Sequence, residues 1–288
     1  MTTTTMLEKN SNQSASRVTS TSTESGRNYQ VKLWSTLNEV SQILRLPFKE
    51  PVSQSNMLLQ HVHYKSGQRI HTIGQDFENF HIVNSGFLKT VLIDEFGYEQ
   101  GLSFPMKGDV LGIDSFHTGK YSTEAVALSD CNLIVVPYKC VVSLARNNFE
   151  FEQLIHAVIS RELARKQAMV SLLGATNAEV KVVRFLLFLS NRFVEIGYSG
   201  KQFELRMTRQ EIGSFLGLSL ETISRSFSSL NDSGLVDVMK KSIKINDHKL
   251  LQLFGRTPTW EKSGRRNSNA KLRLESMWPN GINQSLPN

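Results

Sequence analysis

The chain of 288 residues is 40% hydrophobic and 20% charged, the composition of a globular protein long enough to form two domains. Its formal net charge of +7 suits a polyanionic partner such as nucleic acid, although part of that charge lies in the terminal segments. No run approaches about eighteen consecutive apolar residues, and residues 1–26 lack the apolar core of a signal peptide. We therefore expect a cytoplasmic protein with no membrane partner.

Residues 1–30 are rich in Thr, Ser and Asn and contain few large apolar side chains. Such a segment cannot bury enough surface to offset the entropy of ordering, so we expect a disordered tail. From Val31 to Leu46 apolar residues recur at helical spacing, which predicts a helix that ends before Pro47.

Short apolar or alternating runs separated by glycines extend from Met57 to Pro137. The runs His81–Val83 and Phe87–Ile93, each followed by turn residues, are typical of strands. Many short strands at this spacing predict an antiparallel roll or jelly roll.

His61 and His63 are spaced to share one face of a strand, where two imidazoles could bind a metal ion. We favour a pair of surface imidazoles on an edge strand, because zinc normally takes three or four such ligands. The two cysteines, Cys131 and Cys140, are too few for a disulfide scaffold and form no CxxC motif. A redox role stays open for either cysteine, but we expect each to be a buried small side chain, and we predict no metal site.

A broad apolar stripe with a charged flank runs from Phe151 to Leu173 and predicts a long helix that needs a packing partner. The apolar run from Val180 to Val194 predicts a buried helix of a second domain.

Two short helices are predicted next in the chain. Thr208 and Glu211 form a capping-box pattern, which marks the start of the first helix. That helix reaches Gly217, where a left-handed turn has no steric cost, and Ser219 is the N-cap of a second helix over 219–230. This arrangement predicts a helix-turn-helix, whose second helix enters the DNA major groove.

Glu221, Ser224 and Arg225 project together near the start of the second helix. Arg can donate two hydrogen bonds to guanine, Glu can accept from cytosine, and Ser is an adaptable partner, so we predict these three as base contacts. The alternative is an ordinary Glu–Arg ion pair on a solvated helix. The residues expected to contact the DNA backbone are Thr208, Arg209, Ser219, Thr222, Lys240, Lys241 and Lys244.

The sequence of residues 234–245 predicts a hairpin. Its lysines either contact the DNA phosphates as part of a wing or only prevent other strands from pairing with the hairpin edge. Asp247 then caps a last short helix that ends at Gly255. Residues 256–275 carry six basic and two acidic side chains. We expect a solvated, disordered tail there rather than a phosphate-binding segment.

Several of these segments resemble one family. The stretch MTRQEIGSFLGLSLETISRSF, Met207–Phe227, is similar nearly residue for residue to the DNA-binding motif of the Crp–Fnr transcription regulators. KSGQRIHTIGQ (65–75), VNSGFLKTVLIDEFGYEQ (83–100) and GDVLGIDSF (108–116) resemble the β-roll of the cyclic-nucleotide-binding type in that family. The resemblance covers roughly residues 55–255 of the chain.

Within the family, an apolar Leu220 followed by Glu221, Ser224 and Arg225 resembles the FNR branch. The catabolite-activator branch usually has a basic residue in place of Leu220 and a glycine in place of Ser224. The resemblance implies TTGAT-like half-sites in an inverted repeat and activation through contact with RNA polymerase. Nothing in the chain itself distinguishes an activator from a repressor.

The resemblance also bears on cofactors. FNR proteins hold an iron–sulfur cluster with cysteines near the N-terminus and one internal cysteine, whereas this chain has none before Cys131 and has Ile134 at the internal position. Four thiolates are needed, so we expect no cluster. The segment Gly108–Thr123 lacks the family's phosphate-binding Arg, with Asp114 near the glutamate position and Lys120 as its fixed cation, so we do not expect cyclic AMP to bind.

The long helix matches the place of the family's dimerisation helix, although it could simply pack on the roll. A two-fold dimer would let one recognition helix per subunit read an inverted repeat. Glu162 and Lys166 interrupt the seam, and like charges at Lys166 would weaken the dimer modestly. The predicted seam consists of Phe151, Ile155, Val158, Ile159, Lys166, Val170 and Leu173.

The predicted fold is α+β, with an N-terminal β-roll (jelly roll) of the cyclic-nucleotide-binding type, a long dimerisation helix and a C-terminal winged helix-turn-helix. The predicted boundaries are 1–30 for the tail, 31–148 for the roll, 149–175 for the dimerisation helix, 176–255 for the DNA-binding domain and 256–288 for the basic tail. The predicted function is dimeric, sequence-specific transcription regulation. The alternative is a ligand-sensing module whose helix-turn-helix binds a protein, while no nucleophile–base pair or Walker loop indicates an enzyme.

Overall fold

The computed structural model describes residues 20–22, 29–31, 34–47 and 57–256. Most of the two predicted tails, at 1–30 and 256–288, lies outside these residues. Within the first tail, β1 (Ser20–Ser22) pairs antiparallel with β2 (Tyr29–Val31), which differs from the expected lack of regular structure. Strand pairing uses backbone hydrogen bonds, which a polar composition does not exclude.

The first helix is shorter than predicted. The span expected to be helical includes strand β3 (Trp34–Thr36), which pairs with β4, and only then α1 (Leu37–Ile43). Thr36 and Glu39 form a capping box, in which each side chain accepts a hydrogen bond from the other residue's N–H. This cap starts the helix at Leu37, whereas apolar spacing alone placed the start too early.

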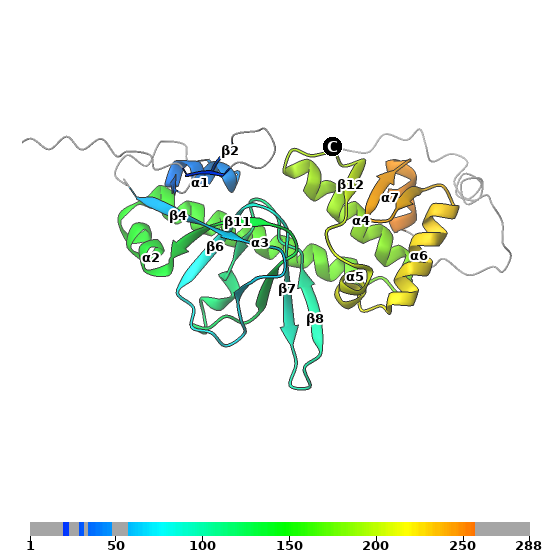
Figure 1. The fold of residues 1–288 in the computed structure, drawn as a ribbon, viewed down its shortest axis with the longest axis horizontal. Helices are drawn as coiled ribbons and strands as arrows, with labels where there is room; N and C mark the ends of the chain where they lie inside the picture. The colour runs from blue at the N-terminus through cyan, green and yellow to red at the C-terminus, as the bar shows by residue number, and fades with distance from the viewer. Residues whose placement is uncertain (1–19, 23–28, 32–33, 48–56, 257–288) are drawn as a thin grey trace, which may run out of the picture.

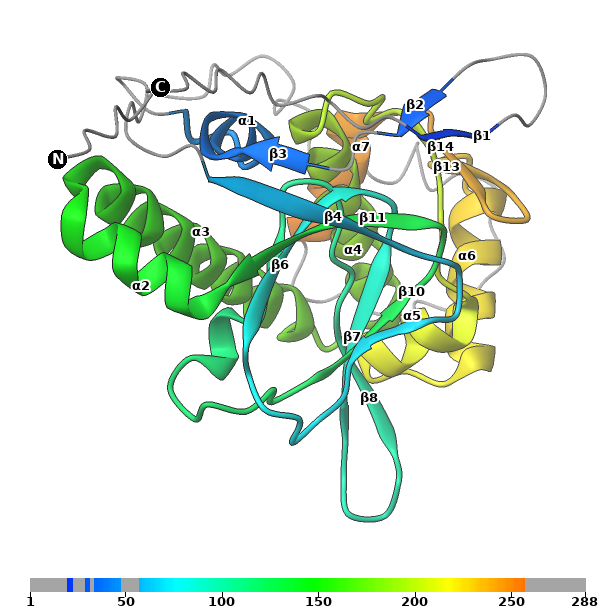
Figure 2. The same cartoon turned by 60° about the vertical axis from the view of Figure 1, so that its left-hand side comes forward.

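Two antiparallel sheets form the β-roll (Figure 2), and the strands predicted from the glycine-punctuated runs are confirmed. One sheet has the order β5-β10-β7-β8 and the other β3-β4-β11-β6-β9. Apolar side chains from both sheets, including Val83, Leu88 and Leu133, form the core between them. The remaining elements of the roll are β4 (Leu58–Tyr64), β5 (Arg69–His71), β6 (Asn79–Ser85), β7 (Leu88–Ile93), β8 (Glu99–Ser103), β9 (Val110–Leu111), η1 (Ile113–Ser115), β10 (Glu124–Ala127) and β11 (Cys131–Pro137).

The prediction that His61 and His63 both lie on the surface is wrong for His61. Strand β4 lies between β3 and β11 rather than at an edge, and His61 is buried. Its ring nitrogens lie 2.8 Å from Ser35 Oγ and 2.7 Å from Asn132 Oδ1, while His63 is exposed. Cys131 is buried as predicted, whereas Cys140 on the helix after β11 is only half-buried, so the prediction is wrong for that residue.

Two helices follow the roll, α2 (Tyr138–Asn147) and α3 (Phe149–Leu173). Asn148 caps α3, because its Oδ1 accepts from Phe151 N–H at 2.8 Å. One side of α3 packs against α1 and the five-stranded sheet in a single apolar cluster. From there α3 runs toward the C-terminal domain (Figure 1).

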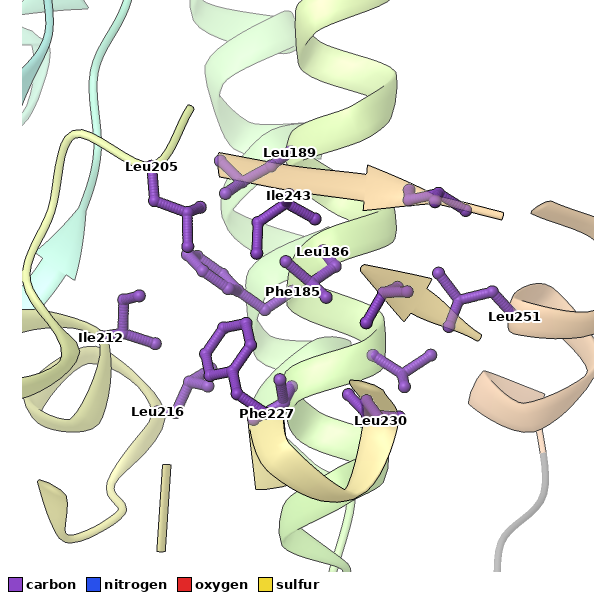
Figure 3. Packing of buried hydrophobic residues seen from close by; sticks show 14 of the residues in the cluster. Phe185, Leu186, Leu189, Leu205, Ile212, Leu216, Phe227, Leu230, Ile243 and Leu251 are labelled. Carbon is purple, nitrogen blue, oxygen red and sulfur yellow. The ribbon is translucent and has the colours of Figure 1, made fainter. Parts of the chain in front are cut away.

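The C-terminal domain is built around α4 (Ala178–Glu195), the buried helix predicted from its apolar run. Figure 3 shows side chains of α4 meeting those of α5 and α6 in one core. Asp247 caps α7 as predicted, with its Oδ1 accepting from Leu250 N–H at 2.9 Å. The other elements are β12 (Gln202–Glu204), α5 (Arg209–Leu216), α6 (Leu220–Asp232), β13 (Val236–Met239), β14 (Ser242–Ile245) and α7 (His248–Arg256).

The roll contributes to the same core. Phe104 and Met106, which follow β8, are buried among residues of the C-terminal domain. The Phe104 ring centroid lies 5.3 Å from that of Phe215 and 6.0 Å from that of Phe185. None of the helices within the described ranges is long and apolar enough to cross a membrane.

Candidate DNA-binding surface

The helix-turn-helix has the local structure that its sequence predicted. Thr208 caps α5, because its N–H donates to Glu211 Oε2 at 2.7 Å and its hydroxyl accepts from Glu211 N–H at 3.2 Å. Gly217 ends α5 with a φ of 65°, in the left-handed region that favours glycine. Ser219 Oγ then caps α6 by accepting from Thr222 N–H at 3.2 Å.

The two sides of α6 differ in polarity. Ile223, Phe227 and Leu230 are buried in the core shared with α4 (Figure 3). On the other side, the side chains of Glu221 and Arg225 are 72% and 78% exposed. Helix α6 therefore presents polar side chains to solvent near its N-terminus, while its opposite side is fixed by packing.

The exposed side chains of α6 bond to one another and to their own helix. Arg225 Nη2 donates to Glu221 Oε1 at 2.5 Å, and Ser224 Oγ donates to the Leu220 carbonyl at 2.9 Å. The ion pair that formed the alternative prediction is thus present. It does not exclude base contacts, because an exposed pair in water contributes little and either partner can be exchanged.

Three predicted phosphate contacts lie at the N-terminal turns of the two helices. Thr208 precedes α5, while Ser219 and Thr222 begin α6 with their hydroxyl oxygens 2.8 Å apart. The hydroxyls of Thr208 and Ser219 serve as helix caps in this structure, and that of Thr222 bonds the Ser219 hydroxyl. The free N–H groups and the dipole of a helix N-terminus favour an anion at such a place.

Arg209 is held by its neighbours rather than extended into solvent. Its guanidinium carbon lies 3.4 Å from the centroid of the Phe227 ring, and its Nη2 donates to the Lys240 carbonyl at 3.3 Å. Burial lowers the pKa of this guanidinium. Its Nη1 is buried and has no hydrogen-bond partner among the residues that the structure describes.

The predicted hairpin is confirmed and forms a wing beside α6. All three of its predicted lysines are exposed. Lys240 has a φ of 56° at the turn, an uncommon conformation for a residue other than glycine. Lys244 Nζ lies 3.4 Å from Asp237 Oδ2, so Lys240 and Lys241 are the cations at the wing tip.

The structure divides the predicted dimer seam between two sides of α3. Phe151 and Val158 pack into the cluster under the roll, so placing these two in the dimer seam was wrong. Ile155 is half-buried at the edge of that cluster. The apolar stripe is broad because one part of it covers the chain's own roll. The predicted seam residues that are exposed on the outer side are Ile159, Lys166, Val170 and Leu173.

Two further residues of α3 lie on a different side of the helix than predicted or belong to the outer face without having been predicted there. Leu163 is 58% exposed and belongs with the outer residues, which follow one another at the four-three spacing of a helical seam. Glu162 instead turns toward the roll, where its Oε1 lies 2.5 Å from Arg165 Nη1. Burial raises the pKa of Glu162, and the charge of Asp109 adds to this effect.

The interior of the roll holds three polar rings. His71 stacks on Tyr121 with ring centroids 3.9 Å apart, and the His81 centroid lies 6.0 Å from that of His71. Burial lowers the pKa of both histidines to about 4. Tyr121 belongs to the segment Gly108–Thr123, and its hydroxyl donates to the Asn79 carbonyl at 2.6 Å. This segment therefore places an aromatic ring, rather than a fixed cation, against the roll interior.

A further cleft lies between the roll and the helices that pack on it. It occupies about 810 Å³ between the five-stranded sheet, α2 and α3, and its walls are mostly apolar, with Phe80, Val141 and Ile155 among them. Across the described ranges, no three His, Cys, Asp or Glu side chains are grouped to hold a metal ion.

Sequence reasoning missed the contacts between the roll and the C-terminal domain. Lys89 Nζ on β7 lies 3.2 Å from the capping-box carboxylate of α5, and Ser214 Oγ accepts from the backbone of β8 at 2.9 Å. Asp109 and Arg192 form a second contact, 2.5 Å between their polar atoms. The one available signal was Gly101, because a glycine inside a strand indicates close approach of another backbone.

Two family models match the chain. A Crp-like helix-turn-helix domain matches residues 180–254, and a cyclic nucleotide-binding domain matches residues 61–148. The matches therefore cover the C-terminal domain and most of the roll.

Known proteins match over most of their own length. The transcriptional regulatory protein btr of Bordetella pertussis is 31% identical over 220 residues, which are 76% of this chain and 91% of that protein. The fumarate and nitrate reduction regulatory protein of Escherichia coli is 34% identical over 194 residues, 67% of this chain and 78% of that protein. The solved structure of FixK2 from Bradyrhizobium japonicum matches with a TM-score of 0.63 at 24% identity, covering 70% of this chain and 100% of that chain. At this identity the match shows a similar fold.

Proposed function

The chain belongs to the Crp–Fnr family of transcription regulators, and we propose that it acts as a homodimer that reads an inverted DNA repeat through α6. The exposed side of α6 is the observation that carries this proposal. Glu221, Ser224 and Arg225 project from the first turns of a helix whose opposite side is fixed in the core. A recognition helix needs this combination of exposed polar groups and a rigid base.

The base contacts follow from the chemistry of the three side chains. On binding, Arg225 exchanges Glu221 for O6 and N7 of a guanine, and Glu221 accepts from N4 of a cytosine. Ser224 releases the Leu220 carbonyl to bond a neighbouring base. Because Leu220 and these residues resemble the FNR branch, we propose TTGAT-like half-sites.

Groups around α6 are proposed to hold the DNA backbone. The N-terminal turns at Thr208, Ser219 and Thr222 favour phosphate. Once released from the Phe227 ring, Arg209 adds its guanidinium donors. The wing adds the cations Lys240, Lys241 and, once released from Asp237, Lys244. Such contacts position the protein without reading sequence.

The outer face of α3 is proposed to form the dimer. Its exposed apolar residues Ile159, Leu163 and Val170 would be covered by the same face of a second copy, which places the two recognition helices about a two-fold axis. Contact with RNA polymerase and activation of transcription are inferred from the resemblance to the FNR branch alone.

We infer that DNA binding requires neither an iron–sulfur cluster nor cyclic AMP. The chain has two cysteines, Cys131 and Cys140, against the four thiolates that a cluster needs. The inward position of Tyr121 in the segment Gly108–Thr123 supports the absence of a cyclic phosphate site, since a buried phosphate needs cationic or N–H donors.

Fluorescence anisotropy tests the proposal with protein purified in air and no added ligand. The wild type should prefer a duplex with inverted TTGAT half-sites over a scrambled duplex by about a thousandfold or more. The logarithm of its affinity should fall linearly with the logarithm of salt concentration. Salt-independent or unselective binding would favour the alternative, in which the helix-turn-helix binds a protein.

Arg225→Ala identifies the base-reading residue. It should remove about 1–3 kcal/mol of discrimination between the two duplexes and leave the affinity for the scrambled one nearly unchanged. Arg69→Ala is the matched control, because Arg69 is also an exposed arginine paired with a glutamate, here Glu124 on the roll. Equal discrimination by wild type and Arg225→Ala would refute the assignment.

A further inference from the structure

The hairpin of β7 and β8 extends from the roll (Figures 1 and 2) and contacts the first helix of the helix-turn-helix. Ser214 on α5 is the centre of this contact. Its Oγ accepts from Gly101 N–H at 2.9 Å and donates to the Glu99 carbonyl at 2.7 Å. The Gln100 side chain donates to the Ser214 carbonyl. Strand β8 is thus hydrogen-bonded to α5 through one serine.

Lys89 adds an ionic contact at the same place. Its side chain is only 16% exposed, and its Nζ lies 2.6 Å from Glu99 Oε1 and 3.2 Å from Glu211 Oε1. Glu211 is the carboxylate that caps α5. Lys89 therefore ties the roll to the residue that fixes the start of α5.

Gly101 lets the two backbones approach each other. A Cβ built on Gly101 would lie 3.1 Å from the N and Cα atoms of Phe215, closer than side chains normally pack. Because those atoms belong to the backbone of α5, they cannot rotate away. Any larger residue at Gly101 would push α5 from β8.

A second anchor lies at the other end of the interface. Asp109 Oδ1 lies 2.5 Å from Arg192 Nη2 of α4 and 2.7 Å from Arg165 Nη1 of α3. Phe104 of the roll packs against Phe215 of α5. The C-terminal domain is therefore docked on the roll at separated points, in addition to its chain connection after α3.

We propose that Lys89, Gly101 and Ser214 are positioning residues that fix the orientation of α6 relative to α3, so that the dimer accepts a single spacing between half-sites. This inference rests on the proposed function. One extra base pair moves a half-site by about 3.4 Å and rotates it by about 35°. A docked domain cannot follow that change, whereas a domain held only by its connection to α3 can.

A series of duplexes tests the proposal, with the spacer between the inverted half-sites changed by one base pair at a time. The wild type should prefer one spacer by about a hundredfold over its neighbours, because the wrong spacing prevents both recognition helices from binding at once. Lys89→Met, Ser214→Ala and Gly101→Ala should each reduce that preference by about tenfold. Their affinity for a duplex with one half-site should equal that of the wild type.

Lys120→Met is the matched control, because Lys120 pairs with Asp76 at an exposed site on the roll. It should keep the wild-type spacer profile. If Gly101→Ala fails to fold by circular dichroism, the two milder variants decide the result.

The outcomes separate this inference from the proposed function. A wild type that binds no inverted repeat selectively overturns both. The positioning role alone is overturned if the wild type selects one spacer and the Lys89→Met and Ser214→Ala variants keep the same spacer profile.

Discussion

Replacing Asp109 by Asn measures how strongly the C-terminal domain is joined to the roll. Its Oδ1 accepts from Arg192 Nη2 at 2.5 Å and from Arg165 Nη1 at 2.7 Å, while its Oδ2 accepts from Met106 N–H at 2.9 Å. The side chains of Asp109 and Arg192 are 12% and 5% exposed, so water screens their attraction only weakly. The substitution keeps the shape of the side chain but removes its charge.

Removing one partner from a buried ion pair costs about 3–5 kcal/mol. Here Arg192 keeps Glu195 at 2.8 Å and Arg165 keeps Glu162 at 2.5 Å, so neither guanidinium is left unpaired. We therefore expect the lower end of that range, about 3 kcal/mol of unfolding free energy.

Urea unfolding followed by circular dichroism gives this value. The Asp109→Asn midpoint should fall with an unchanged slope, in a single transition because Phe104 and Met106 of the roll are part of the C-terminal core. Asp76→Asn applies the same chemical change to an exposed pair with Lys120 and should leave the midpoint where it is. An Asp109→Asn midpoint equal to that of the wild type would show that the buried network contributes nothing to stability.

Three other predictions follow from the structure. Lys166→Leu should lower the dimer dissociation constant in sedimentation equilibrium, because it removes a charge from an exposed apolar seam, and an unchanged constant would contradict that seam. Stability should fall as the pH drops from about 6.5 to about 4, since the unfolded chain then binds protons that the folded roll excludes from His71 and His81. Urea titrations should show this slope reduced in His71→Leu, and an equal slope would rule out the buried ring as its source. Gly86→Ala should lower the melting temperature far more than Gly97→Ala, although both glycines have positive φ. A Cβ at Gly86 would lie 2.5 Å from a backbone oxygen and from a sulfur atom, whereas a Cβ at Gly97 would meet open space. Equal losses in the two variants would mean that the contact at Gly86 relaxes freely.

The parts of the fold that could be predicted depend on neighbours in sequence. The start of α5, the turn at Gly217 and the start of α6 each follow from one or two side chains that bond backbone groups within three residues. The misplaced start of α1 has the same explanation, since the capping pair at Thr36 and Glu39 outweighed a longer apolar pattern. His61 was misjudged because its partners, such as Asn132, come from distant strands.

In the candidate site, too, local features could be predicted from the sequence and contacts with distant residues could not. The direction of Glu221 and Arg225 was predictable, because side-chain directions on a helix follow from the spacing of its residues. The burial of Phe151 and Val158 was not, since an apolar stripe does not tell which of two surfaces covers it. Arg209 likewise has a fixed position only because the Phe227 ring and the wing meet in space.

Glu211 shows how one residue can serve a local and a distant partner at once. Its Oε2 accepts from Thr208 N–H at 2.7 Å, while its Oε1 lies 3.2 Å from Lys89 Nζ. The capping pattern predicted the first contact, but nothing in the sequence near Glu211 indicates the second. Because separate oxygens make the two contacts, a change at Glu211 would disturb both helix formation and docking. Lys89→Met removes the docking contact and leaves the cap, so Lys89 is the position at which the two roles can be separated by measurement.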